Sequence, residues 1–187
     1  MQTLGFSLFD TAIGCCAIAW SAAGLTGVQL PEGDEAAARE RMRRRFPGAP
    51  EAGAPDAVKQ AMREIAALLG GERSDLRNLT LDLDGVGDFQ RRVYALARAI
   101  EPGRTCTYGE LAQALGEPGA ARAVGQALGH NPFAPVVPCH RILAANGRSG
   151  GFSANGGVAT KLRMLMIERA QFGEPGLFDG TSIGDSG

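Results

Sequence analysis

The sequence predicts an α+β protein, with an α/β domain over residues 1–84 followed by a helical domain over residues 85–170. Short strand-like segments are confined to the first half, two short helices joined by a glycine- and proline-containing turn lie in the second half, and the formal charge changes sign between the halves. A chain of 187 residues suffices for one ordinary domain or two small ones. We expect the glycine-rich, acidic tail at residues 171–187 to be disordered.

The first half is expected to form a small sheet accompanied by helices. Its patterns predict strands at about 4–9, 14–20 and 25–30, and helices at 34–46 and 55–71. Within the second strand, the side chains fall into two alternating sets, Cys15, Ala17 and Ala19 against Cys16, Ile18 and Trp20. The segment LTLDLDG at 79–85 alternates like a half-buried edge strand.

An uncharged stretch at 11–31 is long enough to cross a bilayer, but glycine, threonine, serine and glutamine dilute it. No lysine or arginine precedes Arg39, so the basic start of a signal peptide is missing. We therefore interpret the stretch as strand, turn and strand, and expect no membrane partner. The cysteines lack metal-ligand spacing, which favours free thiols in a cytosolic protein without a bound metal. They are Cys15, Cys16, Cys106 and Cys139.

The second half is predicted to be helical. Residues 88–100 have apolar side chains at helical spacing, and Thr107 with Glu110 forms a capping box that starts a helix at Tyr108. A break at 117–119 precedes another short helix at 121–129. This pair is typical of a helix-turn-helix, although many helical hairpins share the pattern. A last helix is expected at about 158–170.

Charge is distributed unevenly along this nearly neutral chain. Residues 1–84 hold nine basic and twelve acidic residues, 85–170 hold ten and five, and the tail holds none and three. The basic second half suggests an anionic partner such as nucleic acid, with ordinary charge scatter as the alternative. We interpret the arginines at 41 and 43–45 as a solvated helix face, and a nucleic-acid patch there as the alternative.

The stretch VVPCHRIL at 136–143 places a thiol beside an imidazole. We interpret Val136 and Val137 as the end of a buried strand, so that Cys139 lies where the strand stops. Burial raises the pKa of a cysteine, whereas a nearby histidine can take its proton. Chain neighbours point apart, so a sharp turn or a bridging water has to connect His140 to the sulfur, and Glu168 is a candidate to orient the imidazole. For an isolated pair, a core cysteine beside a hydrogen-bonded histidine is an equally good interpretation.

The predicted helix at 121–129 has small side chains apart from Arg122 and Gln126. Small residues allow close approach to another backbone, and a single projecting arginine can enter a groove or a gap in a base stack. Tight packing of this helix against the core is the alternative.

Together these motifs resemble those of the O6-alkylguanine-DNA alkyltransferases, also called methylated-DNA–protein-cysteine methyltransferases. The matching motifs span about residues 87–170 and are Phe89-Gln90, Tyr108-Gly109-x-x-Ala112, Arg122-Ala123-Val124-Gly125-x-Ala127, Asn131-Pro132, Pro138-Cys139-His140-Arg141, Gly150-Gly151-Phe152, and Lys161 to Glu168. The first half matches only in general plan. The resemblance implies an RNase H-like α/β domain and a winged-helix-like, helix-turn-helix domain. It also implies repair of O6-alkylguanine, and of O4-alkylthymine, in double-stranded DNA by alkyl transfer to a cysteine after the base is flipped out from the minor groove.

The resemblance also implies residue roles. Cys139 would be the nucleophile, His140 the base acting through a water, and Glu168 the group that orients it. Asn131 would hold the active-site turn, and Tyr108 would help to rotate the 3′ phosphate and hydrogen-bond the base. Arg122 would fill the gap left by the flipped nucleotide. The implied DNA-binding set is Tyr108, Ala121, Arg122, Ala123, Gly125, Gln126 and Ala127. The implied alkylguanine pocket is Leu128, Ile142, Phe152 and Ser153.

The expected product is a thioether, which offers water no electrophilic carbonyl, so each molecule would act once, as a monomer and without a cofactor. The expected location is the bacterial cytoplasm, at the nucleoid, or the nucleus of a eukaryotic cell. The chain departs from the family pattern at two places: Phe152 stands where a tyrosine is common, and Ala154-Asn155 looks like a small insertion. The zinc ligands of some relatives have no counterpart in the sequence, and its length is not expected to accommodate an N-terminal regulatory module. The alternatives are a lesion-binding protein without transfer, against which Cys139 counts, and a Cys-His hydrolase of another fold, in which Arg122 has no role.

Overall fold

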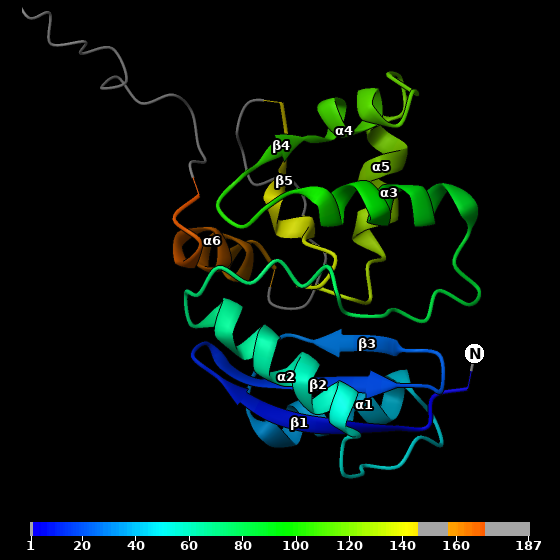
Figure 1. Ribbon diagram of the computed structural model, residues 1–187, viewed down its shortest axis with the longest axis vertical. Coiled ribbons are helices and arrows are strands. Elements are labelled where there is room, and N and C mark those ends of the chain that lie inside the picture. Colours follow the sequence, from blue (N-terminus) through cyan, green and yellow to red (C-terminus); the bar gives the residue numbers. More distant parts are fainter. Residues whose placement is uncertain (1, 146–156, 171–187) are drawn as a thin grey trace, which may run out of the picture.

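The computed structural model describes residues 2–145 and 157–170, with a sheet-containing half below a helical half in Figure 1. Strands β1 (Gly5–Thr11), β2 (Gly14–Trp20) and β3 (Leu25–Gln29) form an antiparallel sheet in the order β1-β2-β3. The three predicted strands and the α+β class are therefore confirmed. The domain boundary at residue 84 stays a prediction, and the tail lies outside the described residues.

Helices cover both faces of β2. On one face, Ala17 and Ala19 pack with Met42 of α1 (Glu35–Arg45). On the other, Ile18 belongs to the main core, which includes Ile65 of α2 (Asp56–Leu69). The two alternating sets in the sequence therefore correspond to two covered faces, which is why the whole run Cys16–Trp20 is buried.

The predicted edge strand at 79–85 is wrong. Leu81 forms only an isolated parallel bridge to Leu25. The chain then turns around Asp82, whose carboxylate accepts hydrogen bonds from the Ser21 hydroxyl at 2.5 Å and the Asp84 amide at 3.0 Å. Alternation indicated correctly that the segment is half-buried, but a strand also needs a continuous run of backbone pairs.

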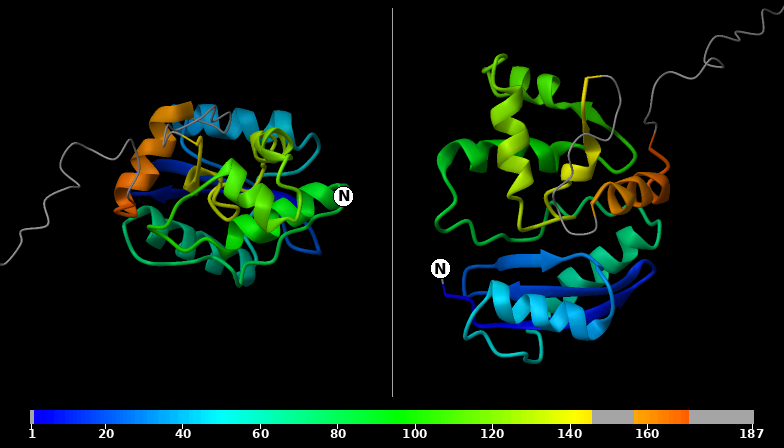
Figure 2. Two further views of the ribbon diagram at one scale, coloured as in Figure 1. Left: turned by 90° about the horizontal axis from the view of Figure 1, so that it is seen from above. Right: turned by 180° about the vertical axis from the view of Figure 1, so that it is seen from behind.

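The α-helices described in the helical half are α3 (Asp88–Ala99), α4 (Tyr108–Ala114), α5 (Ala121–Gly129) and α6 (Gly157–Ile167). The capping box is confirmed, since the Thr107 hydroxyl accepts from the Glu110 amide and the Glu110 carboxylate accepts from the Thr107 amide. Strands β4 (Cys106–Thr107) and β5 (Ile142–Leu143) pair in parallel. Seen from behind, α5 crosses the front of this half (Figure 2).

The two halves meet at β3. The amide of Val28 donates to the carbonyl of Pro132 at 2.9 Å. The guanidinium of Arg45 donates to Pro132 O at 2.7 Å and to Val28 O at 3.1 Å. The interpretation of Arg45 as part of a solvated face is therefore wrong, and burial lowers its pKa to about 10. Its neighbours Arg43 and Arg44 are exposed, as predicted.

The uncharged stretch at 11–31 forms strands and turns, as the sequence predicted. Among the described residues, no helix has the length and apolar character needed to cross a membrane.

Candidate active site at Cys139

Cys139 begins a single 3₁₀ turn, η1 (Cys139–Arg141), which follows a turn rather than a strand. The expected strand end at Val136 and Val137 is therefore wrong, although both residues are buried. The Asn131 side-chain amide donates to Val137 O at 2.8 Å and to Cys139 Sγ at 3.2 Å, and its oxygen accepts from the Phe133 amide at 2.9 Å. Asn131 thus joins both ends of the turn that presents the sulfur.

Cys139 is 3% exposed, and this burial raises the pKa of its thiol. Three features act in the opposite direction, namely the hydrogen bond from Asn131, the charge of Lys161, and the backbone N–H groups of Cys139 and His140. The sulfur is therefore a thiol at rest, in surroundings that stabilise the thiolate once the proton has been removed.

The His140 imidazole contacts Glu168, the residue that follows the end of α6. Its Nε2 lies 2.8 Å from Glu168 Oε1, and the side chains are 0% and 3% exposed. The same carboxylate accepts from Arg141 Nε at 2.9 Å and Nη2 at 2.8 Å, and from the Gly103 amide at 3.1 Å. With Nε2 donating to Glu168, the other ring nitrogen, Nδ1, is a buried acceptor without a partner in the described part of the chain.

The charges around Glu168 and His140 determine which of the two groups is protonated near pH 7. Burial opposes ionisation of Glu168, but the hydrogen bonds from His140 and Arg141 outweigh it and lower the pKa of Glu168 to about 2. Burial lowers the pKa of His140, and although Glu168 acts in the opposite direction, Arg141 offsets part of that carboxylate's charge. The imidazole is therefore neutral near pH 7, which is the form that can accept a proton.

Lys161 also belongs to this site, although the sequence motifs alone assign it no role. It is fully buried, and its Nζ donates to the Ile142 carbonyl at 2.6 Å and lies 6.0 Å from the centre of the Tyr108 ring. Burial lowers its pKa to about 8, so most molecules keep the ammonium charge at pH 7. A signal was present, because Lys161, Met164 and Leu165 recur at the spacing of an inward helix face.

Tyr108 and α5 form the surface beside this site. A cleft of about 540 Å³ is lined by Tyr108, Ala121, Arg122, Gly125 and Gln126, together with Gly129 and His130. Arg122 and Gln126 are exposed, whereas Ala121, Ala123 and Gly125 are half-buried. Burial raises the pKa of Tyr108, which keeps its hydroxyl a hydrogen-bond donor.

One member of the predicted DNA-binding set is misplaced. The Ala127 side chain packs in the main core, and its carbonyl accepts from Gln90 at 3.3 Å. Ala127 is buried, whereas its neighbour Gln126 is exposed, so the methyl group at position 127 is turned towards the core and the proposed DNA contact there has no structural support. Of the predicted pocket, Leu128 and Ile142 are buried, and Phe152 and Ser153 lie outside the described residues, as does the Ala154-Asn155 insertion.

Comparisons with known proteins identify the family. The model of the 6-O-methylguanine DNA methyltransferase DNA binding domain matches residues 88–170. The methylated-DNA–protein-cysteine methyltransferase of Mycolicibacterium paratuberculosis is 45% identical over 115 residues, which are 62% of this chain and 67% of the relative. The chain belongs to the methylated-DNA–protein-cysteine methyltransferase family.

Further similarities extend this family relationship over the first half. The methyltransferase of Methanothermobacter thermautotrophicus is 33% identical over 151 residues, 81% of this chain and 77% of the relative. The crystal structure of Mycobacterium tuberculosis OGT in complex with DNA is similar with a TM-score of 0.72 and 36% identity, and the match covers 89% of this chain and 94% of that one.

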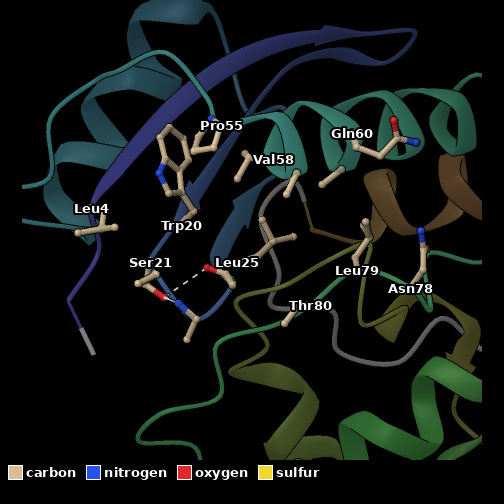
Figure 3. Close-up of a pocket in the computed structure, with 15 residues that line it drawn as sticks. Leu4, Trp20, Ser21, Leu25, Pro55, Val58, Gln60, Asn78, Leu79 and Thr80 are labelled. Atoms are coloured by element: carbon tan, nitrogen blue, oxygen red, sulfur yellow. Dashed lines mark hydrogen bonds between the residues drawn. The ribbon is translucent and has the colours of Figure 1, made fainter.

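The described residues of this methyltransferase-family chain also line an apolar cavity away from Cys139. A cavity of about 590 Å³ in the first half is lined mostly by apolar side chains, among them Trp20, Val58 and Leu79 (Figure 3). Within residues 2–145 and 157–170, no group of three or more His, Cys, Asp or Glu side chains is arranged to hold a metal ion. The four cysteines are free thiols.

Proposed function

We propose that Cys139 is the residue that accepts the alkyl group when this methyltransferase repairs O6-alkylguanine, and O4-alkylthymine, in double-stranded DNA. The protein binds DNA and repairs O6-methylguanine by methyl transfer to a cysteine, as its family does. The observation that carries the assignment to Cys139 is its buried sulfur, which contacts Asn131 beside a His140–Glu168 pair with a free acceptor nitrogen.

Proton removal comes first in the proposed reaction. His140 Nδ1 takes the thiol proton through a bridging water, because among the described residues this nitrogen forms no direct hydrogen bond to the sulfur. The imidazolium that forms is stabilised by Glu168, which Arg141 and Gly103 hold in place. The thiolate is stabilised by the Asn131 amide and the charge of Lys161.

The displacement then forms one bond and breaks one. A sulfur lone pair attacks the alkyl carbon, the bond from that carbon to O6 breaks, and its electron pair remains on the guanine. The Tyr108 hydroxyl donates a hydrogen bond to the departing base, and the proton that the guanine finally takes up balances the one lost by the thiol. Because a thioether has no leaving group activated towards water, the protein is consumed after one transfer.

The access of the base to the sulfur is part of the proposal. Cys139 is buried, so a base inside a duplex reaches it only after rotating out of the stack. The smooth surface of α5 suits close approach to the minor groove, and the exposed Arg122 is placed to occupy the gap. We propose that the protein acts as a monomer, since one chain contributes every group used here. Its similarity to bacterial methyltransferases supports a location in the DNA-containing cytoplasm of a bacterial cell.

Intact-protein mass spectrometry tests the assignment. After incubation with a duplex containing O6-methylguanine, we expect the protein to gain the mass of one CH₂ group, located by peptide mapping at Cys139. Cys139→Ala should gain nothing, whereas Cys106→Ala, which removes a half-buried free thiol, should react normally.

An unchanged mass in a folded protein that binds the lesion tightly would instead support the lesion-binding alternative. Repeated turnover of an ester in the absence of DNA would support the hydrolase alternative. A monomer is checked by sedimentation of the free protein.

A further inference from the structure

A second cleft gathers three arginines from separate parts of the chain. It measures about 440 Å³ and is lined by Arg73, Gly103, Arg104, Thr105 and Arg169. Arg73 follows α2, Arg104 lies in the connection between α3 and β4, and Arg169 follows α6. The last two segments lie at the same edge of the molecule in Figures 1 and 2. We call this site the arginine cleft.

Among the residues that the structure describes, no carboxylate pairs with these three guanidinium groups. Elsewhere the described arginines commonly have partners, as Arg39 does with Glu51 and Arg92 with Glu117. Within the described part of the chain, Arg73, Arg104 and Arg169 form no ion pair or side-chain hydrogen bond, and no acidic side chain lines the cleft. Glu168 is adjacent in sequence, but its carboxylate is already bound by His140 and Arg141. Positive charge is therefore concentrated in the cleft, and the described residues place no carboxylate in its lining.

The backbone holds two of these arginines in place. Gly103 has φ +84°, and a Cβ atom there would lie 3.0 Å from the Glu168 carbonyl oxygen. The Gly103 amide also donates to the Glu168 carboxylate at 3.1 Å. The loop that carries Arg104 is therefore packed directly against the end of α6, from which Arg169 projects.

Arg169 occupies a position that favours glycine. Its φ is +53°, its amide donates to Met166 O at 3.0 Å, and the Ala170 amide donates to Leu165 O at 2.9 Å. These two bonds form a Schellman motif, whose left-handed residue is usually glycine because a Cβ is disfavoured there. A long cationic side chain at this position is a local departure from the stable choice, which is expected at a site that serves a function.

We propose that the arginine cleft binds a phosphate group, supplied either by the DNA backbone or by free phosphate. Guanidinium groups pair with phosphate oxygens through two parallel N–H bonds, and three arginines line this one cleft. The cleft shares no lining residue with the α5 cleft. It would therefore give the protein a phosphate contact outside the surface proposed to enter the minor groove.

The first experiment uses inorganic phosphate as the probe. Amide NMR signals of Gly103 and Thr105 are followed during titration with phosphate, against chloride at equal ionic strength. The matched variants are Arg104→Gln and Arg43→Gln, since Arg43 is an exposed arginine on α1. Saturable shifts in the wild type and Arg43→Gln, absent in Arg104→Gln, identify the cleft as a site for free phosphate.

The second experiment uses an undamaged DNA duplex. The dependence of log affinity on log salt concentration is measured for the wild type, Arg73→Gln, Arg104→Gln and Arg43→Gln. A DNA phosphate in the cleft predicts that the steepness of this dependence falls by about 0.9 for each variant that loses one phosphate contact, but not for Arg43→Gln. If phosphate shifts neither amide and all variants retain the wild-type slope, the proposal is overturned. Undamaged DNA involves no transfer, so this result is independent of the role of Cys139.

Discussion

The substitution Glu168→Gln tests the buried network on which the proposed chemistry depends. At pH 7 it removes a carboxylate that binds His140, Arg141 and the Gly103 amide, and it leaves the buried Arg141 cation without a counter-ion. Breaking a buried pair in this way costs about 3–5 kcal/mol of unfolding free energy. Glu117→Gln is the control, because its pair with Arg92 is on the surface and contributes roughly 0–1 kcal/mol.

The effect of Glu168→Gln should depend on pH, with a sign that follows from the pKa. The pKa of Glu168 falls from 4.5 to about 2 on folding, so the ionised carboxylate stabilises the folded protein above pH 4.5. That contribution, about 3 kcal/mol in full, is lost as the pH falls, and about 2 kcal/mol of it is gone by pH 3. The gap in stability between wild type and variant should therefore narrow by about 2 kcal/mol from pH 7 to pH 3.

Urea unfolding followed by the fluorescence of the single tryptophan, Trp20, measures this gap, since the residue is buried in the native state. Comparing two proteins at each pH cancels the titration of all other carboxylates. A gap of the same size at pH 7 and pH 3 would refute the inference that Glu168 is ionised and bound to Arg141. A gap below 1 kcal/mol at pH 7 would refute the strength assigned to the network.

Three further changes test other contacts. Asn131→Ala removes the amide that donates a hydrogen bond to Cys139 Sγ, so the pKa of the thiol should rise and its alkylation by iodoacetamide should slow at a given pH. The free energy of unfolding should fall by about 1–3 kcal/mol. An unchanged alkylation rate would contradict the contact. Arg45→Met should lower the free energy of unfolding by about 1–3 kcal/mol, because the Pro132 carbonyl loses one hydrogen-bond donor. The control, Arg44→Met at an exposed neighbour, should change the free energy of unfolding in urea by less than about 0.5 kcal/mol. Equal effects would show that the buried hydrogen bond contributes little. Arg169→Gly should raise the free energy of unfolding by about 1 kcal/mol, measured as a higher Tm, because glycine tolerates the left-handed backbone. A lower Tm would mean that contacts of the arginine side chain stabilise the fold by more than the left-handed conformation destabilises it.

The local features of the chain were predictable because neighbouring residues produce them. The capping box at Thr107 and Glu110 starts α4, and the helices at 88–99 and 121–129 follow from nearby apolar spacing, caps and breaks. Alternation in β2 identified two faces, although it could not show that helices cover both. At residues 79–85 the same signal failed, because pairing depends on a distant partner strand and on the turn around Asp82.

The sequence by itself determined the family, the two short helices α4 and α5, and the adjacent Cys139 and His140, since these are local motifs in fixed order. Only the tertiary structure decided how the pair works, because the 3₁₀ turn points the sulfur at Asn131 and the imidazole at Glu168. It also moved Ala127 into the core and Arg45 to the contact between the halves, and it brought three distant arginines around one cleft. These outcomes depend on which surfaces meet after the chain has folded, and residue spacing along a single element carries no information about that.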